Sequence, residues 1–177
     1  MARGIHELNL NTDIINIDQK LFIKLIDNNN LFVFQNLAQA YEAEFSSITD
    51  KSPNAQGLFS LDTLPTQPCI GYLVYQETSP LGFCVLDIDA QPMYIAEFYI
   101  IPSQRKKKIG IQFSHYIFSK HPGYWQVQQI KGADNAVKFW RKSISIYTLD
   151  NYKEEMLEDP VWGQVTRQTF LSISSDL

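Results

Sequence analysis

The sequence predicts an α+β fold, in which helices cover both faces of a mixed, mostly antiparallel β-sheet. Three apolar segments rich in β-branched and aromatic residues, at 70–76, 82–88 and 93–101, are separated by short polar turns. Such segments are typical of buried strands, and short turns between successive strands favour antiparallel pairing. Helical patterns precede and follow these strands, and they would form the layers that cover the sheet.

The sequence pattern of the N-terminal quarter of the chain predicts a strand followed by a helix. Residues 1–19 are polar and weakly patterned, and we expect an N-terminal arm or an added edge strand there. An apolar run at 21–26 predicts a strand. Between 31 and 45 the apolar residues recur at helical spacing, which predicts a helix with Tyr41 and Glu44 near its end.

A long loop is expected between this helix and the first strand of the meander. The segment 51–68 contains three prolines and one glycine, which interrupt regular structure. Loops of this length in compact domains are often functional.

The segment after the third meander strand has the features of an anion-binding site. Polar and basic residues at 104–108 lead into a helical pattern in which Ile109, Phe113 and Ile117 recur at helical spacing. The first turn of a helix has backbone N–H groups without intrahelical partners, and its dipole is positive at that end. A strand, a basic loop and a helix N-terminus therefore suit a phosphate group, and Gly110 allows close approach to the backbone.

The C-terminal part predicts two more helix–strand connections. A strand at 125–130 follows the helix, and because a helix connects it to the strand at 93–101, we expect these two strands to be parallel. The remaining expected elements are a helix at 135–142, strands at 144–149 and 164–173, and an acidic, mobile segment at 150–162.

Composition limits the class of protein. The chain has 177 residues, of which 45% are hydrophobic and 13% aromatic, which indicates one globular domain spanning 1–177. Its net charge of −4 and pI of about 5.3 disfavour a general nucleic-acid binder. No apolar run is long enough to span a bilayer and the N-terminus lacks an apolar signal core, so we expect a cytoplasmic protein without a membrane partner.

The potential metal ligands do not form a recognisable pattern. Cys69 and Cys84 lack metal-site spacing, and the three histidines form no cluster with them or with paired carboxylates. We therefore expect no metal cofactor.

Two blocks of sequence resemble the GNAT N-acetyltransferase superfamily. Residues 105–110 fall on the family's acetyl-CoA motif, Arg/Gln-x-x-Gly-x-Gly/Ala, with Arg105 and Gly110 matching and Lys108 at the first glycine. If that position requires a positive φ, the lysine is strained. Residues 136–142, Ala-Val-Lys-Phe-Trp-Arg-Lys, resemble a later helix of the family. The resemblance runs from about residue 21 to the C-terminus and is nearest to a bacterial branch of predicted acetyltransferases.

The resemblance implies an acetyl-CoA-dependent N-acetyltransferase that moves an acetyl group to a primary amine by direct sequential transfer. In that family the parallel central strands splay, and the pantetheine arm of acetyl-CoA fits between them. The implied cofactor contacts are the backbone of Phe98, Tyr99, Ile100 and Ile101, the pyrophosphate loop of Arg105, Lys106, Lys107, Lys108, Ile109 and Gly110, and the helix residues Phe139 and Trp140.

Glu97 is the candidate general base. A carboxylate in an apolar central strand is costly unless it has a partner. Acetyl transfer needs a neutral amine, whereas a lysine-like ammonium has a pKa of about 10.4, and a partly desolvated carboxylate can take up that proton. Alternation along the strand would place Glu97 on one face with Ile95 and Tyr99. The alternative is a structural glutamate that is paired with a lysine or an arginine, or that faces water at a splayed edge.

The other candidate site residues are tyrosines and a second glutamate. Where many family members have a tyrosine as general acid, this chain has Trp140, so the candidates are Tyr147 and Tyr99. A thiol has a pKa of about 8.5, and its thiolate can also leave without a dedicated acid. Tyr41 and Glu44 could line the acceptor site, as in related enzymes.

Two other functions are compatible with the sequence. Lys108, Trp140 and Ala133 depart from the family pattern and favour a catalytically degenerate acyl-CoA-binding sensor or interaction module. The basic segment 105–108 would suit a nucleic-acid patch, against which the acidic pI argues. The final strands could also pair in a homodimer.

Overall fold

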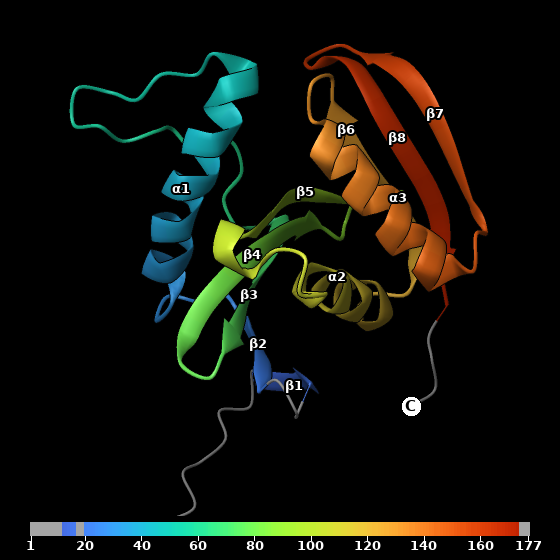
Figure 1. Ribbon diagram of the computed structural model, residues 1–177, viewed down its shortest axis with the longest axis horizontal. Coiled ribbons are helices and arrows are strands. Elements are labelled where there is room, and N and C mark those ends of the chain that lie inside the picture. The colour runs from blue at the N-terminus through green and yellow to red at the C-terminus, as the bar shows by residue number, and fades with distance from the viewer. Residues whose placement is uncertain (1–11, 17–19, 174–177) are drawn as a thin grey trace, which may run out of the picture.

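Eight strands form a single sheet in the part of the chain that the computed structural model describes, residues 12–16 and 20–173 (Figure 1). The strand order is β1-β2-β3-β4-β5-β6-β8-β7, and the one parallel pair among the described strands is β5–β6. Along the chain the elements are β1 (Thr12–Asn16), β2 (Leu21–Leu25), α1 (Leu31–Thr49), β3 (Cys69–Gln76), β4 (Ser79–Asp87), β5 (Met93–Ile100), the short 3₁₀ helix η1 (Pro102–Gln104), α2 (Ile109–Lys120), β6 (Gly123–Ile130), α3 (Asp134–Thr148), β7 (Tyr152–Asp159) and β8 (Gly163–Ser172).

The N-terminal segment contributes an edge strand. β1 pairs antiparallel with β2 at the end of the sheet. Residues 1–11 and 17–19, which complete the segment expected to form an arm or edge strand, lie outside the described residues.

Helices cover both faces of the sheet, as predicted. Phe34 and Ala38 of α1 pack on one face, in a cluster that includes Leu73 and Phe83. On the opposite face α2 and α3 cover a larger cluster, to which the intervening strand residues such as Val74 contribute. Alternate residues of β3 and β4 therefore point to different cores, which explains why these strands are almost continuously apolar.

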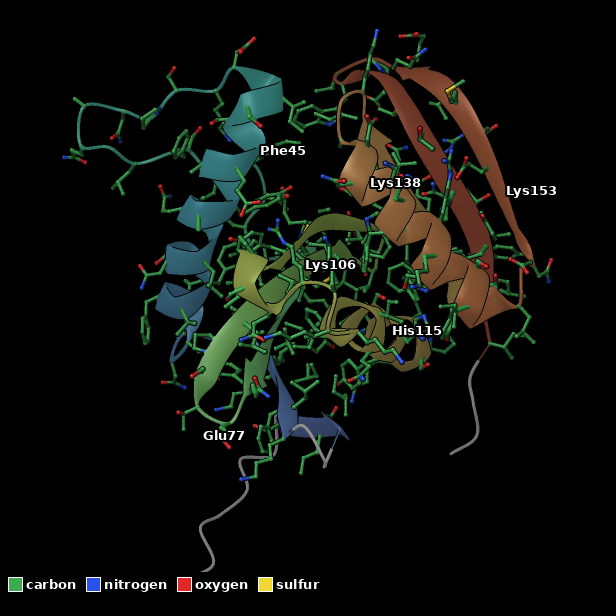
Figure 2. The ribbon with its side chains drawn as sticks, viewed as in Figure 1. Phe45, Glu77, Lys106, His115, Lys138 and Lys153 are labelled. Atoms are coloured by element: carbon green, nitrogen blue, oxygen red, sulfur yellow. The ribbon has the colours of Figure 1, made fainter. Side chains whose placement is uncertain are left out.

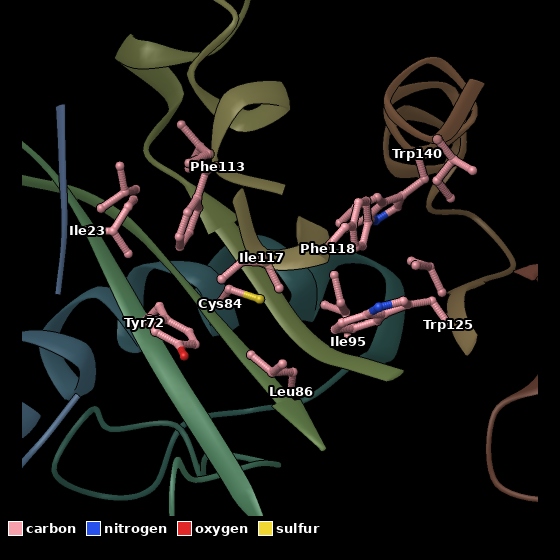
Figure 3. Packing of buried hydrophobic residues seen from close by; sticks show 14 of the residues in the cluster. Ile23, Tyr72, Cys84, Leu86, Ile95, Phe113, Ile117, Phe118, Trp125 and Trp140 are labelled. Carbon is pink, nitrogen blue, oxygen red and sulfur yellow. The ribbon is translucent and has the colours of Figure 1, made fainter. Parts of the chain in front are cut away.

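The larger core is centred on α2. Its residues Phe113, Ile117 and Phe118 are fully buried, and Phe118 packs against Trp125 of β6 and Trp140 of α3, with ring centroids 5.3 and 6.2 Å apart (Figure 3). The helical spacing seen in the sequence thus marks the buried face of α2.

The central parallel strands splay apart. In the described chain β5 and β6 pair only at Met93 with Trp125 and at Tyr94 with Gln126, although both strands continue for several residues (Figure 1). The fold class and the splayed central pair predicted from the sequence and its resemblance are confirmed.

A bulge in β5 corrects the predicted side-chain alternation. β4 pairs Val85 with Glu97 but the next residue, Leu86, with Ile95, so Ala96 is an extra residue on β5. Ile95 therefore lies in the α2 and α3 core, whereas Tyr99 lies in the α1 core. The expectation that Ile95, Glu97 and Tyr99 share one face is wrong, because a bulge shifts the period-two pattern by one residue.

The C-terminal region differs from the prediction in two elements. The expected strand at 144–149 is the last part of α3, because Trp140, Ile144 and Tyr147 continue an apolar stripe at helical spacing onto the core. The acidic segment expected to be mobile contains β7, which pairs with β8 over its whole length. Charged side chains on an edge strand of this kind hinder pairing with other chains.

Candidate functional site

The loop between η1 and α2 presents a row of unpaired backbone donors. No hydrogen bond within the described residues is donated by the backbone N–H groups of residues 106–111. The flanking groups are paired: Arg105 N–H donates to Pro102 O at 3.2 Å, and Gln112 N–H donates to Lys108 O at 3.0 Å. Six successive free donors at a helix N-terminus can bind an anion such as a diphosphate.

Left-handed residues shape this loop. Lys106 and Lys108 have φ of 64° and 66°, on either side of Lys107. Lysine is strained in this region because its Cβ approaches the carbonyl oxygen. Lys108 is where the resembling family has its first glycine, so the structure shows that the position does require a positive φ.

We expect Lys108→Gly to stabilise the fold by about 0.5–1 kcal/mol, because glycine adopts positive φ without the Cβ clash. The free energy of unfolding, measured by urea denaturation, checks this. Lys107→Gly is the matched control, since it removes the same charge at a residue without positive φ and should destabilise the fold slightly. Equal effects of the two substitutions would contradict the prediction.

The basic side chains of the loop point in different directions. Lys106 and Lys108 are exposed, and Lys107 Nζ donates to Gln104 Oε1 at 3.0 Å. In Figure 2 the loop, marked by Lys106, lies between α1 on one side and α3 on the other. Arg105 instead turns toward α1, where its Nη2 donates to Glu44 Oε2 at 2.9 Å.

The strand before the loop keeps an unpaired edge toward β6. Beyond Tyr94, β5 has no β6 partner in the described chain, and Phe98, Tyr99 and Ile100 lie in this stretch. The Ile100 carbonyl accepts a bond from Arg105 Nε at 2.8 Å, and Ile101 N–H donates to Leu81 O at 2.8 Å on the β4 side. The implied pantetheine-binding residues therefore lie at the splayed edge, with these two backbone groups already engaged.

Phe139 and Trp140 form the packing beneath the loop. A Cβ added at Gly110 would lie 3.1 Å from Phe139 Cε2, so α2 approaches α3 closely where it has no side chain. Phe98 stacks on Phe139 with centroids 5.5 Å apart and meets Trp140 edge-on at 4.9 Å. This aromatic cluster holds the helix N-terminus beside the end of β5.

Glu97 lies on the α1 side of β5, among groups that perturb its protonation. Burial raises the pKa of Glu97 to about 7, against hydrogen bonds from Tyr41 and Thr63 that lower it, and nearby Glu42 and Asp62 raise it further. The same contact, added to burial, raises the pKa of Tyr41 well above its usual value. Tyr41 therefore stays protonated and donates a hydrogen bond to the Glu97 carboxylate, which can itself accept a proton near neutral pH.

An ion network around the buried Glu42, next to Glu97, holds the long loop on α1. Lys51 Nζ lies 2.8 Å from Glu42 Oε2 and 2.7 Å from Asp62 Oδ1, and Glu42 is only 2% exposed. The side-chain amide of Gln39 also binds the backbone of Phe59: its Oε1 accepts from Phe59 N–H at 2.8 Å, and its Nε2 donates to Phe59 O at 3.1 Å. The loop therefore packs against α1 and presents Thr63 to Glu97.

Sequence reasoning missed Glu42, Lys51, Asp62 and Thr63. One signal was available for Glu42, which continues the stripe of Phe34 and Ala38 at intervals of four residues on the buried side of α1. The loop residues gave no comparable signal, because their approach to Glu97 depends on the path of an irregular segment.

Tyr147 is not brought together with Glu97. Its hydroxyl interacts with Ser172 Oγ at 2.7 Å and Ser119 Oγ at 3.2 Å, and its ring packs in the α2 and α3 core near Phe118. Glu97, by contrast, meets α1 and the long loop. Tyr41 and Glu44, the predicted acceptor-side residues, do lie on the Glu97 side, on α1.

Two further features of the described residues concern metals and membranes. These residues contain no group of three or more His, Cys, Asp or Glu side chains that could hold a metal ion. No helix in the same part of the chain is long and apolar enough to cross a membrane.

Comparison with known proteins identifies the architecture. No protein-family model and no curated protein matches the sequence. Among solved structures, the ribosomal alpha-N-protein acetyltransferase RimL in complex with coenzyme A superposes with a TM-score of 0.60 at 13% identity, over 90% of this chain and 98% of that one. A Bacillus cereus acetyltransferase of the GNAT family gives 0.56 at 11% identity, over 86% and 98%.

A third similar structure is a spermidine N-acetyltransferase SpeG chimera from Vibrio cholerae and hSSAT. It gives a TM-score of 0.58 at 13% identity, over 86% of this chain and 96% of that one. All three superpose on this chain over nearly their whole length. The chain therefore has the fold of the GNAT acetyltransferases.

Proposed function

We propose that this protein is an acetyl-CoA-dependent N-acetyltransferase that moves an acetyl group to a primary amine by direct sequential transfer. The observation that carries the proposal is the coincidence of two unsatisfied backbone surfaces at one end of β5. The strand edge facing β6 is unpaired there, and the six free N–H groups of residues 106–111 follow directly. Unpaired backbone groups are costly when buried without a partner, so this end of the sheet is suited to an amide-containing, anionic ligand.

Acetyl-CoA supplies both chemical features, since its pantetheine arm has amide groups and its diphosphate is anionic. The free N–H groups at 106–111 would bind the diphosphate, with the positive end of the α2 dipole behind them. The exposed Lys106 and Lys108 add positive charge around the loop. The similarity to RimL, which was solved with coenzyme A, supports this ligand.

Glu97 would act as the general base. Glu97 would first take one proton from the acceptor ammonium, directly or through one water. The neutral amine nitrogen then forms a bond to the thioester carbon as the carbon–sulfur bond breaks, and the second proton that the nitrogen loses goes to the departing thiolate. A carboxylate whose pKa is raised to about 7 by burial is a better proton acceptor than an ordinary glutamate. The Tyr41 hydroxyl and Thr63 hold it in place.

The leaving group needs no partner from Tyr147. A thiol has a pKa of about 8.5, so its thiolate is a tolerable leaving group near neutral pH. Since the Tyr147 hydroxyl is engaged by Ser172 and Ser119, we assign no step to it. The carboxylates of Glu42 and Asp62 near Glu97 share the single ammonium of Lys51, so this group keeps an excess negative charge that favours an acceptor arriving as a cation.

Ligand binding and turnover test the proposal separately. Acetyl-CoA at a hundred times its Kd should add about 2.7 kcal/mol to the free energy of unfolding and raise the melting temperature by about 5–10 °C. A panel of primary amines should then release free CoA thiol, measured with a thiol reagent. A thermal shift without thiol release would favour the acyl-CoA-binding module, and the absence of both would refute the proposal.

A further inference from the structure

The side chain of Arg105 is fixed by groups outside the cofactor loop. Its Nη2 donates to Glu44 Oε1 at 3.1 Å and to Oε2 at 2.9 Å, and its Nε donates to Ile100 O at 2.8 Å. Arg105 ends η1 and directly precedes the free N–H groups of 106–111. The residue at the start of the loop is thus tied both to α1 and to the end of β5.

Tyr99 completes this contact. Its hydroxyl donates to Glu44 Oε1 at 3.0 Å, and the Arg105 guanidinium carbon lies 5.5 Å from its ring centroid. Burial raises the pKa of Tyr99 to about 12, and the Glu44 carboxylate adds to the shift. Tyr99 therefore remains a donor, and Glu44 has two donors that fix its orientation.

We propose that Glu44 is a positioning residue of the diphosphate site, which acts by holding Arg105 and so fixing the start of the 106–111 loop. This inference rests on the proposed function, because it assumes that the loop binds the diphosphate of acetyl-CoA. A guanidinium held by both oxygens of one carboxylate has its charge compensated, so Arg105 serves as an anchor of the loop. The loop contains two left-handed lysines and would lose its alignment without that anchor.

The same helix also reaches the base. Tyr41, which donates to Glu97, precedes Glu44 by three residues and so lies on the same side of α1. One rigid helix thereby sets the position of the proposed base and of the cofactor loop. The distance between the proposed base and the start of the cofactor loop then depends on α1.

A rival reading gives the opposite result for one substitution. If Arg105 were itself a ligand of the diphosphate, Glu44 would compete with the diphosphate for the guanidinium. Glu44→Gln would then free the cation and tighten acetyl-CoA binding. If Glu44 positions the loop through Arg105, Glu44→Gln weakens binding.

Calorimetric titration of acetyl-CoA into four proteins decides between these readings. We expect Glu44→Gln and Arg105→Gln each to weaken the Kd roughly fivefold, the upper range for a half-exposed ion pair. The double variant should be no weaker than either single variant, because both remove the same anchor. Tighter binding by Glu44→Gln, or losses that multiply in the double variant, would overturn the proposal.

A second ion pair supplies the control. Arg167 Nε donates to Glu155 Oε1 at 3.0 Å within the β7–β8 hairpin, so Glu155→Gln removes a similar pair without touching the loop. It should leave the Kd unchanged. Kinetics with an amine that the wild-type protein acetylates give a further readout. Glu44→Gln should raise the KM for acetyl-CoA about as much as it raises the Kd, and it should change kcat less. A general loss of stability would not produce this difference.

The outcomes separate this proposal from the proposed function. If the wild-type protein does not bind acetyl-CoA, both fail. If the wild type binds and turns over but Glu44→Gln binds as tightly or more tightly, only the positioning role of Glu44 fails.

Discussion

Glu97→Gln should lower kcat/KM for acetyl transfer by about a hundredfold to a thousandfold. Glutamine has nearly the same shape as glutamate and can still accept a hydrogen bond from Tyr41, but it cannot take up the proton of the amine. Because the substitution leaves the loop at 106–111 untouched, acetyl-CoA binding should persist. Steady-state kinetics with an amine that the wild type accepts, together with acetyl-CoA titration, measures the two effects separately.

The pH dependence gives this prediction a second readout. For the wild type, kcat/KM should rise with pH and level off above a pH of about 7, where Glu97 becomes ionised and able to accept a proton. The variant should lack this rise. An unchanged rate in Glu97→Gln, or an unchanged pH profile, would exclude Glu97 as the base and favour its structural reading.

The free energy of unfolding should fall as the pH rises, whereas kcat/KM increases. Burial raises the pKa of Glu97 from 4.5 to about 7, so the folded protein binds a proton between these values that the unfolded chain has released. The stability linked to this proton is present below pH 4.5 and is lost as the pH rises through about 7. The variant should not show this loss, which denaturation at several pH values can measure.

Local patterns predicted most of the elements that the structure contains. The spacing of Ile109, Phe113 and Ile117 marks the buried side of α2, and all three are in the core. Turn residues between apolar runs marked the meander of β3, β4 and β5. These features depend on residues close in sequence, where periodicity is informative.

The errors arise where distant residues decide the structure. The bulge at Ala96 depends on the pairing of β5 with β4, and no residue within β5 indicates it. The charged sequence of β7 is typical of an irregular segment, but eight residues of β8 pair with it. Ile144 and Tyr147 favour a strand when they are considered alone, but in the structure both side chains contact the core as part of a helix.

The candidate site divides in the same way. Glu97 and the loop could be found from the sequence, because a carboxylate in an apolar strand and a basic segment before a helix are local anomalies. The ion network of Glu42, Lys51 and Asp62 brings together a helix and an irregular loop, so only the structure shows it. The contact between Arg105 and Glu44 is likewise visible only in the structure, since the two residues lie 61 positions apart in the sequence.

Gly82→Ala should be the most destabilising single-methyl change in the sheet next to the site. A Cβ at Gly82 would lie 2.0 Å from the carbonyl oxygen of Tyr99 and 2.8 Å from Ile100 Cδ1. Backbone cannot rotate away as a side chain does, so β4 and β5 would have to separate where Gly82 pairs with Ile100. We expect a loss of about 3 kcal/mol in the free energy of unfolding and a melting temperature lower by about 10 °C.

Gly57→Ala separates steric contact from backbone strain. Gly57 has φ of +78° but nothing within 4 Å of the added Cβ, so the same methyl should cost only about 1 kcal/mol there. If the two variants lost equal stability, the close approach of β4 to β5 would not be the reason that position 82 requires glycine.

Tyr99 and Ile100 also provide the groups that fix Glu44 and Arg105, so Gly82→Ala should weaken acetyl-CoA binding even at temperatures where the variant is folded. Gly57→Ala, in the long loop, should leave that affinity intact.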